Sequence, residues 1–321
     1  MQPDAPTPVN GEPGPRPSRG VTAPLRQATS LGAQVAALPI RAIGSLARPV
    51  RADLGRDVRR SLGLPETPGP RVTDPEKAFY HPDSIVRRVH GDLPSMLIGG
   101  LGALLLQTLH PLAMAGVAEH SRYREDPLGR LRRTAAFVGA TTFGTDEQAR
   151  EAIERVKWVH RKVRGVAPDG RPYAADEPEL VTWVHVAEVY SFLNAARRFG
   201  RLRLGAAECD EYYAETARVA HDLGAEWVPR TAEEVTAYFL RVRPELYAGP
   251  QALAARDFLL RGVGSRPEDR AVHALVAAGA VSLLPGWARA ELRIPTPPGV
   301  DALLVVPLAR VLCAGLRWAV T

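Results

Sequence analysis

The sequence predicts an all-α protein, and three observations carry that prediction. From residue 74 onward, helix-like runs of roughly 12 to 25 residues alternate with short turns, and their apolar side chains recur at helical spacing. Stretches in which β-branched residues alternate with polar ones are scarce. The chain has 321 residues, 45% of them hydrophobic and 24% charged, which is enough for one large buried core. We therefore expect a single large helical domain preceded by a flexible N-terminal tail.

Two segments precede the main domain. Residues 1–23 are rich in proline and glycine and too poor in apolar side chains to offset the entropy of ordering, so we expect a flexible tail rather than a secretory signal. Residues 24–73 combine a basic amphipathic helix with a linker. Pro39 and Pro49 interrupt the apolar surface of this helix, which favours packing on the protein's own domain. Contact with a membrane surface is the alternative.

The main domain is expected over residues 74–290, and its first long apolar segment has two interpretations. Residues 94–118 are 25 positions without a formal charge, which is long enough to span a bilayer. Against a membrane span stand the polar residues in its middle and the glycines between positions 99 and 102, which suit close helix packing. We favour a buried central helix that bends at His110 and Pro111.

Further helices follow along the chain. We predict them over residues 146–164, 178–199, 206–223, 232–242, 249–261 and 267–284. The final segment, residues 291–321, ends in an apolar run that contains Arg310 and Arg317. We expect this segment to form an apolar helix that packs on the domain or on a membrane surface.

Charge and cysteine content argue against several classes of protein. The 41 basic residues exceed the 35 acidic ones by six, but they are scattered among acids, which argues against nucleic-acid binding. Cys209 and Cys313 stand far apart and lack the spacing of a disulfide framework or a thiolate zinc site. We expect a reduced, cytoplasmic protein, with peripheral contact to a membrane as the alternative.

Histidines on apolar helix faces are the main signal for chemistry, since the chain contains no HExxH pair, GxSxG elbow or phosphate-binding glycine loop. His160 lies four residues after Val156 and three before Val163, so its imidazole is expected to point into the core. A hydrogen-bonded core histidine is the simplest interpretation. Arg164, one turn further along that face, would keep the imidazole neutral and would suit an anionic ligand group.

Two further histidines have comparable surroundings. His185 lies among apolar and aromatic residues on its predicted helix, and Glu188 can orient the ring if both side chains face inward. His110 precedes Pro111, where the helix must bend, and a local backbone hydrogen bond is a sufficient explanation for it.

A cluster of arginines lies between these histidines in the sequence. If a helix begins near Pro127, then Arg130, Arg133 and Thr134 share one face. Arginines that face inward need counter-charges, because an unpaired buried charge is costly. A solvated basic face is the alternative.

Four motifs in a fixed order give the chain a family resemblance. They are VHGD at 89–92, the uncharged helix ending in LHPLAMAGVAEHSRYREDPLGRLRRT at 109–134, VHRKVRG at 159–165, and ELVTWVHVAEVYS at 179–191. Over about residues 80–290 the chain resembles the MpaB / rubber oxygenase (latex-clearing protein) catalytic-domain family.

The resemblance implies a helical domain around a buried haem b pocket, with His160 as the axial iron ligand and Arg164 beside it. It also implies that the RLxxT element supplies Arg130 and Thr134 near the haem. We assign His110 and His185 to the cofactor-binding set as well, with His185 in the pocket wall or orienting a partner.

The resemblance further implies a reaction. Where latex-clearing proteins have a lysine that can occupy the opposite iron position, this sequence has Arg133, and a guanidinium is a poor ligand because it hardly ever deprotonates. We therefore expect an open or water-filled distal site. Family members cleave carbon–carbon double bonds in isoprenoid chains, so the expected reaction oxidises a hydrophobic small molecule with dioxygen. Glu119 is the candidate base for an allylic proton, and Arg133 is the second candidate catalytic residue.

Two other functions remain open at this point. The first is a haem or lipid carrier that uses the same pocket without turnover. The second is a non-haem metal enzyme built on His110, His160 and His185.

Overall fold

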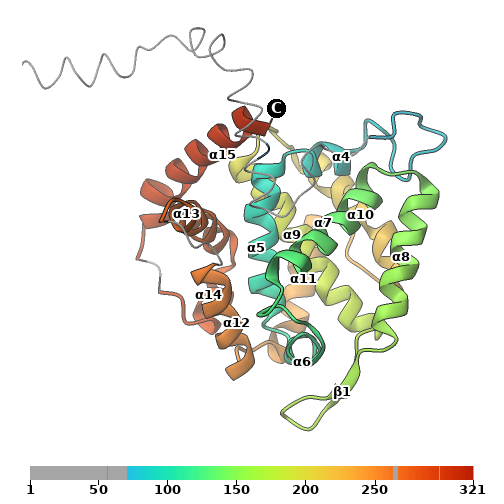
Figure 1. Cartoon of the computed structure of the whole chain (residues 1–321), viewed down its shortest axis with the longest axis vertical. Helices are drawn as coiled ribbons and strands as arrows, with labels where there is room; N and C mark the ends of the chain where they lie inside the picture. The colour runs from blue at the N-terminus through green and yellow to red at the C-terminus, as the bar shows by residue number, and fades with distance from the viewer. Residues whose placement is uncertain (1–55, 57–70, 263–266, 296, 321) are drawn as a thin grey trace, which may run out of the picture. The chain divides into compact units, whose positions relative to one another are not determined.

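The computed structural model describes Arg56 and residues 71–262, 267–295 and 297–320 (Figure 1). The predicted tail, residues 1–23, lies outside the described residues, as does nearly all of the segment 24–73. The described chain is helical apart from a short hairpin and the connecting loops, so the all-α prediction is confirmed.

The helices fall into two runs along the chain. The first run contains α4 (Ile85–His90), α5 (Leu93–Gln107), α6 (Pro111–His120), α7 (Pro127–Phe143), α8 (Asp146–His160), the strands β1 (Arg164–Val166) and β2 (Pro172–Ala174), and α9 (Pro178–Phe199). The second contains α10 (Ala206–Leu223), α11 (Ala232–Val242), the 3-10 turn η1 (Arg243–Glu245), α12 (Pro250–Arg261), α13 (Pro267–Leu283), α14 (Gly286–Glu291), the π-helical turn η2 (Asp301–Val305) and α15 (Val306–Val320). The bounds of α9, α10 and α11 match the predicted ones.

The core of the domain is the pair of helices α5 and α9, with α13 on the other side of α5 (Figure 1). Glycines make this close approach feasible. A Cβ on Gly99 would lie only 3.0 Å from the Cβ of Ala195 on α9, and a Cβ on Gly102 would lie 3.5 Å from the Ala280 carbonyl on α13. The predicted role of these glycines in close helix packing is confirmed, and they pack against α9 and α13.

The uncharged segment 94–118 forms two helices rather than one. α5 and α6 meet at an angle of 107°, and Pro111 begins α6, so the predicted bend is confirmed. The carbonyl of Gln107 at the end of α5 accepts a hydrogen bond of 3.2 Å from the Trp183 indole, which compensates for the interrupted helix. Trp183 itself is completely buried, which fixes the bend within the core.

The C-terminal helix α15 packs against α13, α5 and α9 through one of its faces. Ala309 and Cys313 on this face are completely buried. Arg317 forms a bidentate ion pair with Asp92, at 2.6 and 2.5 Å, and also donates to the carbonyl of Phe199. The ion pair therefore ties the end of the chain to the junction of α4 and α5.

The hairpin is the part of the fold that the helical prediction missed. β1 and β2 are antiparallel, with Gly165 opposite Tyr173. Between the strands Gly170 has a φ of 85°, a backbone conformation that favours glycine. The sequence there, Ala-Pro-Asp-Gly-Arg, carries a turn signal. The strands are too short, at three residues each, to show an alternating pattern.

A buried chain of polar groups links α4, α7 and α10. The two ring nitrogens of His90 lie 2.9 Å from the hydroxyl of Thr142 and 2.9 Å from the hydroxyl of Tyr212. Burial lowers the pKa of His90 to about 3, so the ring is neutral and uses one nitrogen as donor and the other as acceptor. His90 belongs to the VHGD motif, and this network is the structural role of that histidine.

We predict that this histidine makes the protein sensitive to acid. The folded pKa of His90, about 3, lies below the ordinary value of 6.5, so between these values the unfolded chain binds a proton that the folded chain does not. The stabilising effect of a neutral His90 is complete above pH 6.5 and is lost as the pH falls toward 3. At about pH 5, His90 alone should lower the free energy of unfolding by about 2 kcal/mol relative to neutral pH.

Urea unfolding of the wild type and of His90→Gln at neutral pH and at about pH 5 measures this difference. Glutamine cannot titrate, so the variant should lose less stability on acidification than the wild type does. Equal losses in the two proteins would show that His90 does not carry the effect.

Candidate functional site

His160 is the last residue of α8. The helix begins with a capping box formed by Thr145 and Gln148, and Ala149 and Ile153 are buried on its inward side. His160 continues that side at the final turn, where its ring is half-buried and its Nδ1 atom is buried without a hydrogen-bond partner. Burial lowers the pKa of the ring, which is therefore neutral at pH 7. The imidazole points inward, as its place on the apolar stripe predicts.

Arg164 is not the helical neighbour of His160 that the spacing predicts, so this expectation is wrong. The helix ends at His160, and the N–H of Val163 donates to the His160 carbonyl at 3.0 Å as the chain turns into β1. Arg164 is exposed on β1 and pairs with both carboxylate oxygens of Asp176, at 3.0 and 2.7 Å. Burial, rather than Arg164, keeps His160 neutral, and the charge of Asp176 acts weakly in the opposite direction.

His110 is the N-cap of α6 and is buried. Its Nδ1 atom has no hydrogen-bond partner, and its Nε2 atom lies 4.0 Å from the Glu245 carboxylate. Burial, with a smaller contribution from Arg171, lowers the pKa of His110 to about 4. We expected a local backbone hydrogen bond to explain His110 as a purely structural residue. The Nδ1 atom does not make such a bond.

His185 lies on the inward side of α9. Its Nε2 atom is buried and has no partner, and burial together with the nearby His221 lowers its pKa to about 4. Glu188, one turn later, has a pKa raised to about 7 by burial. Glu188 does not bond to Nε2 of His185, so the predicted orienting contact is not made at that atom.

Glu119, near the end of α6, forms a short contact with the hairpin. Its Oε2 atom accepts a hydrogen bond of 2.5 Å from the hydroxyl of Tyr173, which is buried on β2. Desolvation and this carboxylate raise the pKa of Tyr173 to about 12, so its hydroxyl stays protonated. A Cβ on Gly165 would lie 2.6 Å from the tyrosine hydroxyl, so the contact requires glycine there. Sequence reasoning missed Tyr173, and the turn signal before it is the clue that could have found it.

The predicted basic face of α7 is only partly inward. The helix begins at Pro127, as expected, and Arg130 is half-buried, where it donates to the Ser121 hydroxyl at 3.2 Å. Arg133 and Thr134 are exposed, and Arg133 pairs with the N-cap residue Asp126 at 3.3 Å. These three side chains therefore do not share one inward face. The buried residues of α7, Thr141 and Thr142, lie at its far end, and the first part of the helix is half-buried or exposed.

Packing brings the motif segments together around α6. A Cβ on Gly116 would lie 3.4 Å from the ring of Tyr173 and 3.5 Å from the side chain of Val163. Leu180 at the start of α9 belongs to the same small apolar cluster. The segments that carry His110 and Glu119, His160 and Arg164, and His185 thus lie against one another, although they are far apart in the sequence.

The structure also bears on the alternative of a non-haem metal enzyme. Across the described ranges, no group of three His, Cys, Asp or Glu side chains is arranged to hold a metal ion. His110, His160 and His185 therefore do not form the ligand cluster that a non-haem metal enzyme needs.

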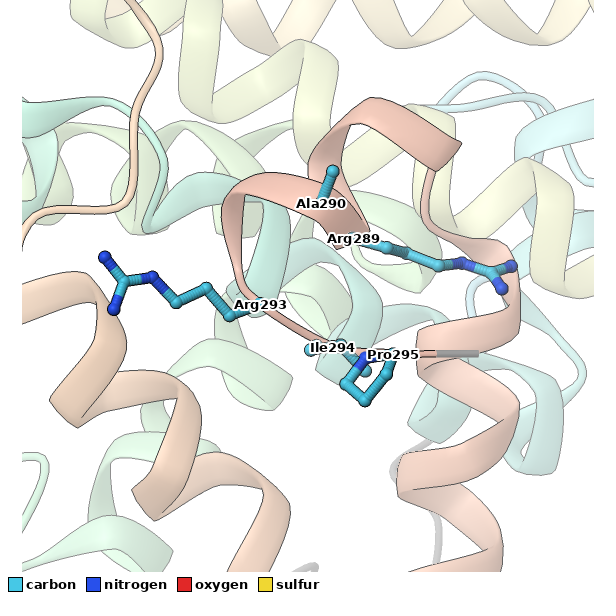
Figure 2. Close-up of a pocket in the computed structure, with 5 residues that line it drawn as sticks. All are labelled: Arg289, Ala290, Arg293, Ile294 and Pro295. Carbon is cyan, nitrogen blue, oxygen red and sulfur yellow. The ribbon is translucent and has the colours of Figure 1, made fainter. Parts of the chain in front are cut away.

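Figure 2 shows a hollow on another part of the surface. It is lined by α14 and the loop that follows, through Arg289, Ala290, Arg293, Ile294 and Pro295. Its volume of about 280 Å³ lies just below the range of about 300 to 1,000 Å³ that is typical of ligand pockets. None of the predicted haem residues lines it, so the buried haem pocket stays a prediction.

The fold and the site define an all-helical domain in which α6, the hairpin and the start of α9 pack together, and the neutral His160 ends the helix that leads into the hairpin. A comparison with known families matches residues 87–318 to the family described as ER-bound oxygenase mpaB/B'/Rubber oxygenase, catalytic domain. The chain belongs to this oxygenase family, as its four motifs predict. No match was found among curated proteins or among solved structures. The matched region extends past residue 290 into α15.

Proposed function

We propose that this protein is a haem b-dependent oxygenase that uses dioxygen to oxidise a hydrophobic small molecule of the isoprenoid class. The family match supports an oxygenase in general. The observation that supports the haem assignment is His160, whose neutral imidazole has a buried ring nitrogen without a hydrogen-bond partner.

The residues present fit a haem in two respects. Axial ligation requires a neutral imidazole, and either of its ring nitrogens can bind iron. Helix α7 also has half-buried apolar side chains, among them Leu131, Phe137 and Val138, whose exposed parts a porphyrin can cover. When bound, the haem supplies the iron at which dioxygen binds and is activated.

Arg130 is the candidate partner for a haem propionate. Its guanidinium is half-buried, burial lowers its pKa, and it bonds to a neutral hydroxyl. A carboxylate would be a stronger partner, because charge-assisted hydrogen bonds are about twice as strong as neutral ones. Arg164 has a different role in this account, since its pairing with Asp176 holds the turn that follows His160 in place.

We assign the other predicted residues to the surroundings of this proposed haem site. We assign His110 and His185, which are neutral and inward-facing, to the wall of the pocket. Thr134 and Arg133 are exposed on α7, and we assign them to the entrance of the proposed haem site. Arg133 would not hold the iron, because a guanidinium hardly ever deprotonates, so His160 would be the residue that holds the haem.

We propose Glu119 as the base that removes a proton from the substrate. Its carboxylate is half-exposed, which lets a substrate reach it, and Tyr173 holds it in one orientation. Tyr173 donates to Oε2, so Oε1 is the atom that can take up a proton from an allylic C–H.

Oxygen uptake tests the proposed function. The purified full chain, loaded with haemin and supplied with squalene as an isoprenoid probe, should consume dioxygen and release carbonyl products. Preparations without haemin, or without squalene, should not. A protein that binds haemin but consumes no dioxygen with squalene or with shorter isoprenoids would be a carrier, and the oxygenase proposal would be wrong.

A further inference from the structure

The outward face of α15 and η2 is the largest concentration of exposed apolar side chains on the described chain. Five of the thirteen large hydrophobic residues that are exposed belong to this one segment. They are Leu303 (83% exposed), Leu304 (55%), Leu308 (43%), Val311 (70%) and Trp318 (36%). From Leu304 onward they recur at helical spacing, so they form one continuous stripe. Contiguous apolar surface of this kind marks an interaction site.

Arginines border this stripe on one side. The side chain of Arg310 reaches the carbonyl of Arg198 at 2.9 Å, and Arg317 reaches the carbonyl of Phe199, so the end of α9 lies against α15. The chain there, residues 197–205, carries four arginines and no acidic residue, and all four side chains are exposed. The stretch of chain beside the apolar stripe therefore contributes only basic charges.

We propose that this face, the α15 stripe with its flanking arginines, docks on the surface of an anionic lipid bilayer. Helices that lie in a membrane interface expose leucine and tryptophan on one face and carry arginine or lysine beside it, and the cations attract anionic headgroups. Arginine can also extend its charged end to the headgroups while its aliphatic stem stays on apolar surface.

The helix lies on the bilayer and does not cross it. By length and composition Asp301–Ala319 is apolar enough to span a membrane. Its inward face, however, is occupied by the domain, with Ala309 and Cys313 completely buried. Crossing the bilayer would also break the bidentate ion pair between Arg317 and Asp92.

A second copy of the chain is a poorer occupant of this face. A twofold contact uses the same patch of both copies, and the stretch 197–205 beside the stripe carries no carboxylate with which the arginines of the other copy could pair. An anionic bilayer provides both the apolar interior and the opposite charge.

Vesicle sedimentation of the full-length protein tests the proposal. The probes are vesicles of phosphatidylcholine alone and of phosphatidylcholine with about one third phosphatidylglycerol. The wild type should bind the anionic vesicles at least tenfold better. Leu304→Ser combined with Val311→Ser should lose binding to both. Arg201→Gln combined with Arg203→Gln should lower binding to the anionic vesicles by about thirtyfold, since each arginine near the surface contributes about fivefold.

Matched controls come from other faces of the protein. Leu240→Ser on α11 removes a leucine that is 73% exposed, and Arg155→Gln on α8 removes an exposed arginine. Both should bind vesicles as the wild type does. In the unaltered sequence, brominated lipids should quench tryptophan fluorescence, and Trp318→Phe should remove that quenching.

Three results would overturn the proposal. The first is a wild type that binds neither kind of vesicle. The second is an α15 double variant that binds as well as the wild type, which would assign binding to another part of the chain. The third is a dimer in light scattering that the α15 double variant dissociates, which would make a second copy the occupant.

Discussion

Replacing His160 with alanine is expected to remove haem binding and oxygen uptake together. The imidazole is the one group that we assign to the iron, and Arg133 cannot substitute for it. Changes to groups that merely support a metal ligand typically cost about 10- to 100-fold in affinity, so loss of the ligand itself should exceed about 100-fold. The Soret absorbance of haemin-loaded protein and the rate of oxygen uptake measure the two losses.

Two other histidines provide matched controls. His185→Ala removes an inward-facing, neutral imidazole from the pocket wall, so it should weaken haem binding by no more than about tenfold. His81→Ala removes a ring that is 58% exposed and should change neither measurement. Equal losses in His160→Ala and His185→Ala would contradict the assignment of His160 as the ligand.

Replacing Glu119 with glutamine is expected to slow turnover by about 100- to 10,000-fold, the range typical of a general base, while the haem spectrum stays that of the wild type. Glutamine keeps the shape of the side chain and can still accept the hydrogen bond from Tyr173, but it cannot take up a proton. Steady-state oxygen uptake with a saturating isoprenoid probe measures the change. An active Glu119→Gln protein would rule out the carboxylate as the base.

Variants of the residues that contact Glu119 distinguish the effect of losing the base from the effect of losing the contacts that hold it in place. Tyr173→Phe removes the hydroxyl and leaves the carboxylate, so turnover should fall by only about tenfold. Gly165→Ala should be more damaging, because its Cβ would lie 2.6 Å from the Tyr173 hydroxyl and 2.9 Å from Oε2 of Glu119. The glycine of the VHRKVRG motif is thus explained by a contact between two side chains that lie 54 residues apart.

Local patterns predicted most of the helices. α10 and α11 each bury one side, which is the pattern that predicts an amphipathic helix, and the side chain of Thr231 caps α11. The end of α8 could not be predicted in this way. Val163 continues the helical stripe, but the backbone of this segment pairs with β2 instead, and the Val163 carbonyl accepts from the N–H of Ala175 at 2.9 Å. Tertiary pairing overrides the local preference there.

The sequence predicted the direction of a candidate side chain only where that direction depends on a single helix. The inward direction of His160 follows from its position relative to Ile153 and Val156 on α8. The partner of Arg164, by contrast, is Asp176 on the far side of the hairpin, and no spacing rule reveals it. The exposed position of Arg133 was also not predictable from spacing. Arg133 pairs with Asp126, the residue that caps the start of α7, and helical spacing alone does not reveal this contact.

A titration of the purified full-length protein with haemin, followed in the Soret region, tests the central claim most directly. We expect saturation at one haemin per chain in the wild type and no saturable binding in an equally well folded His160→Ala protein. Failure of the folded wild type to take up haemin, or the same titration curve in both proteins, would contradict the claim that His160 holds a haem.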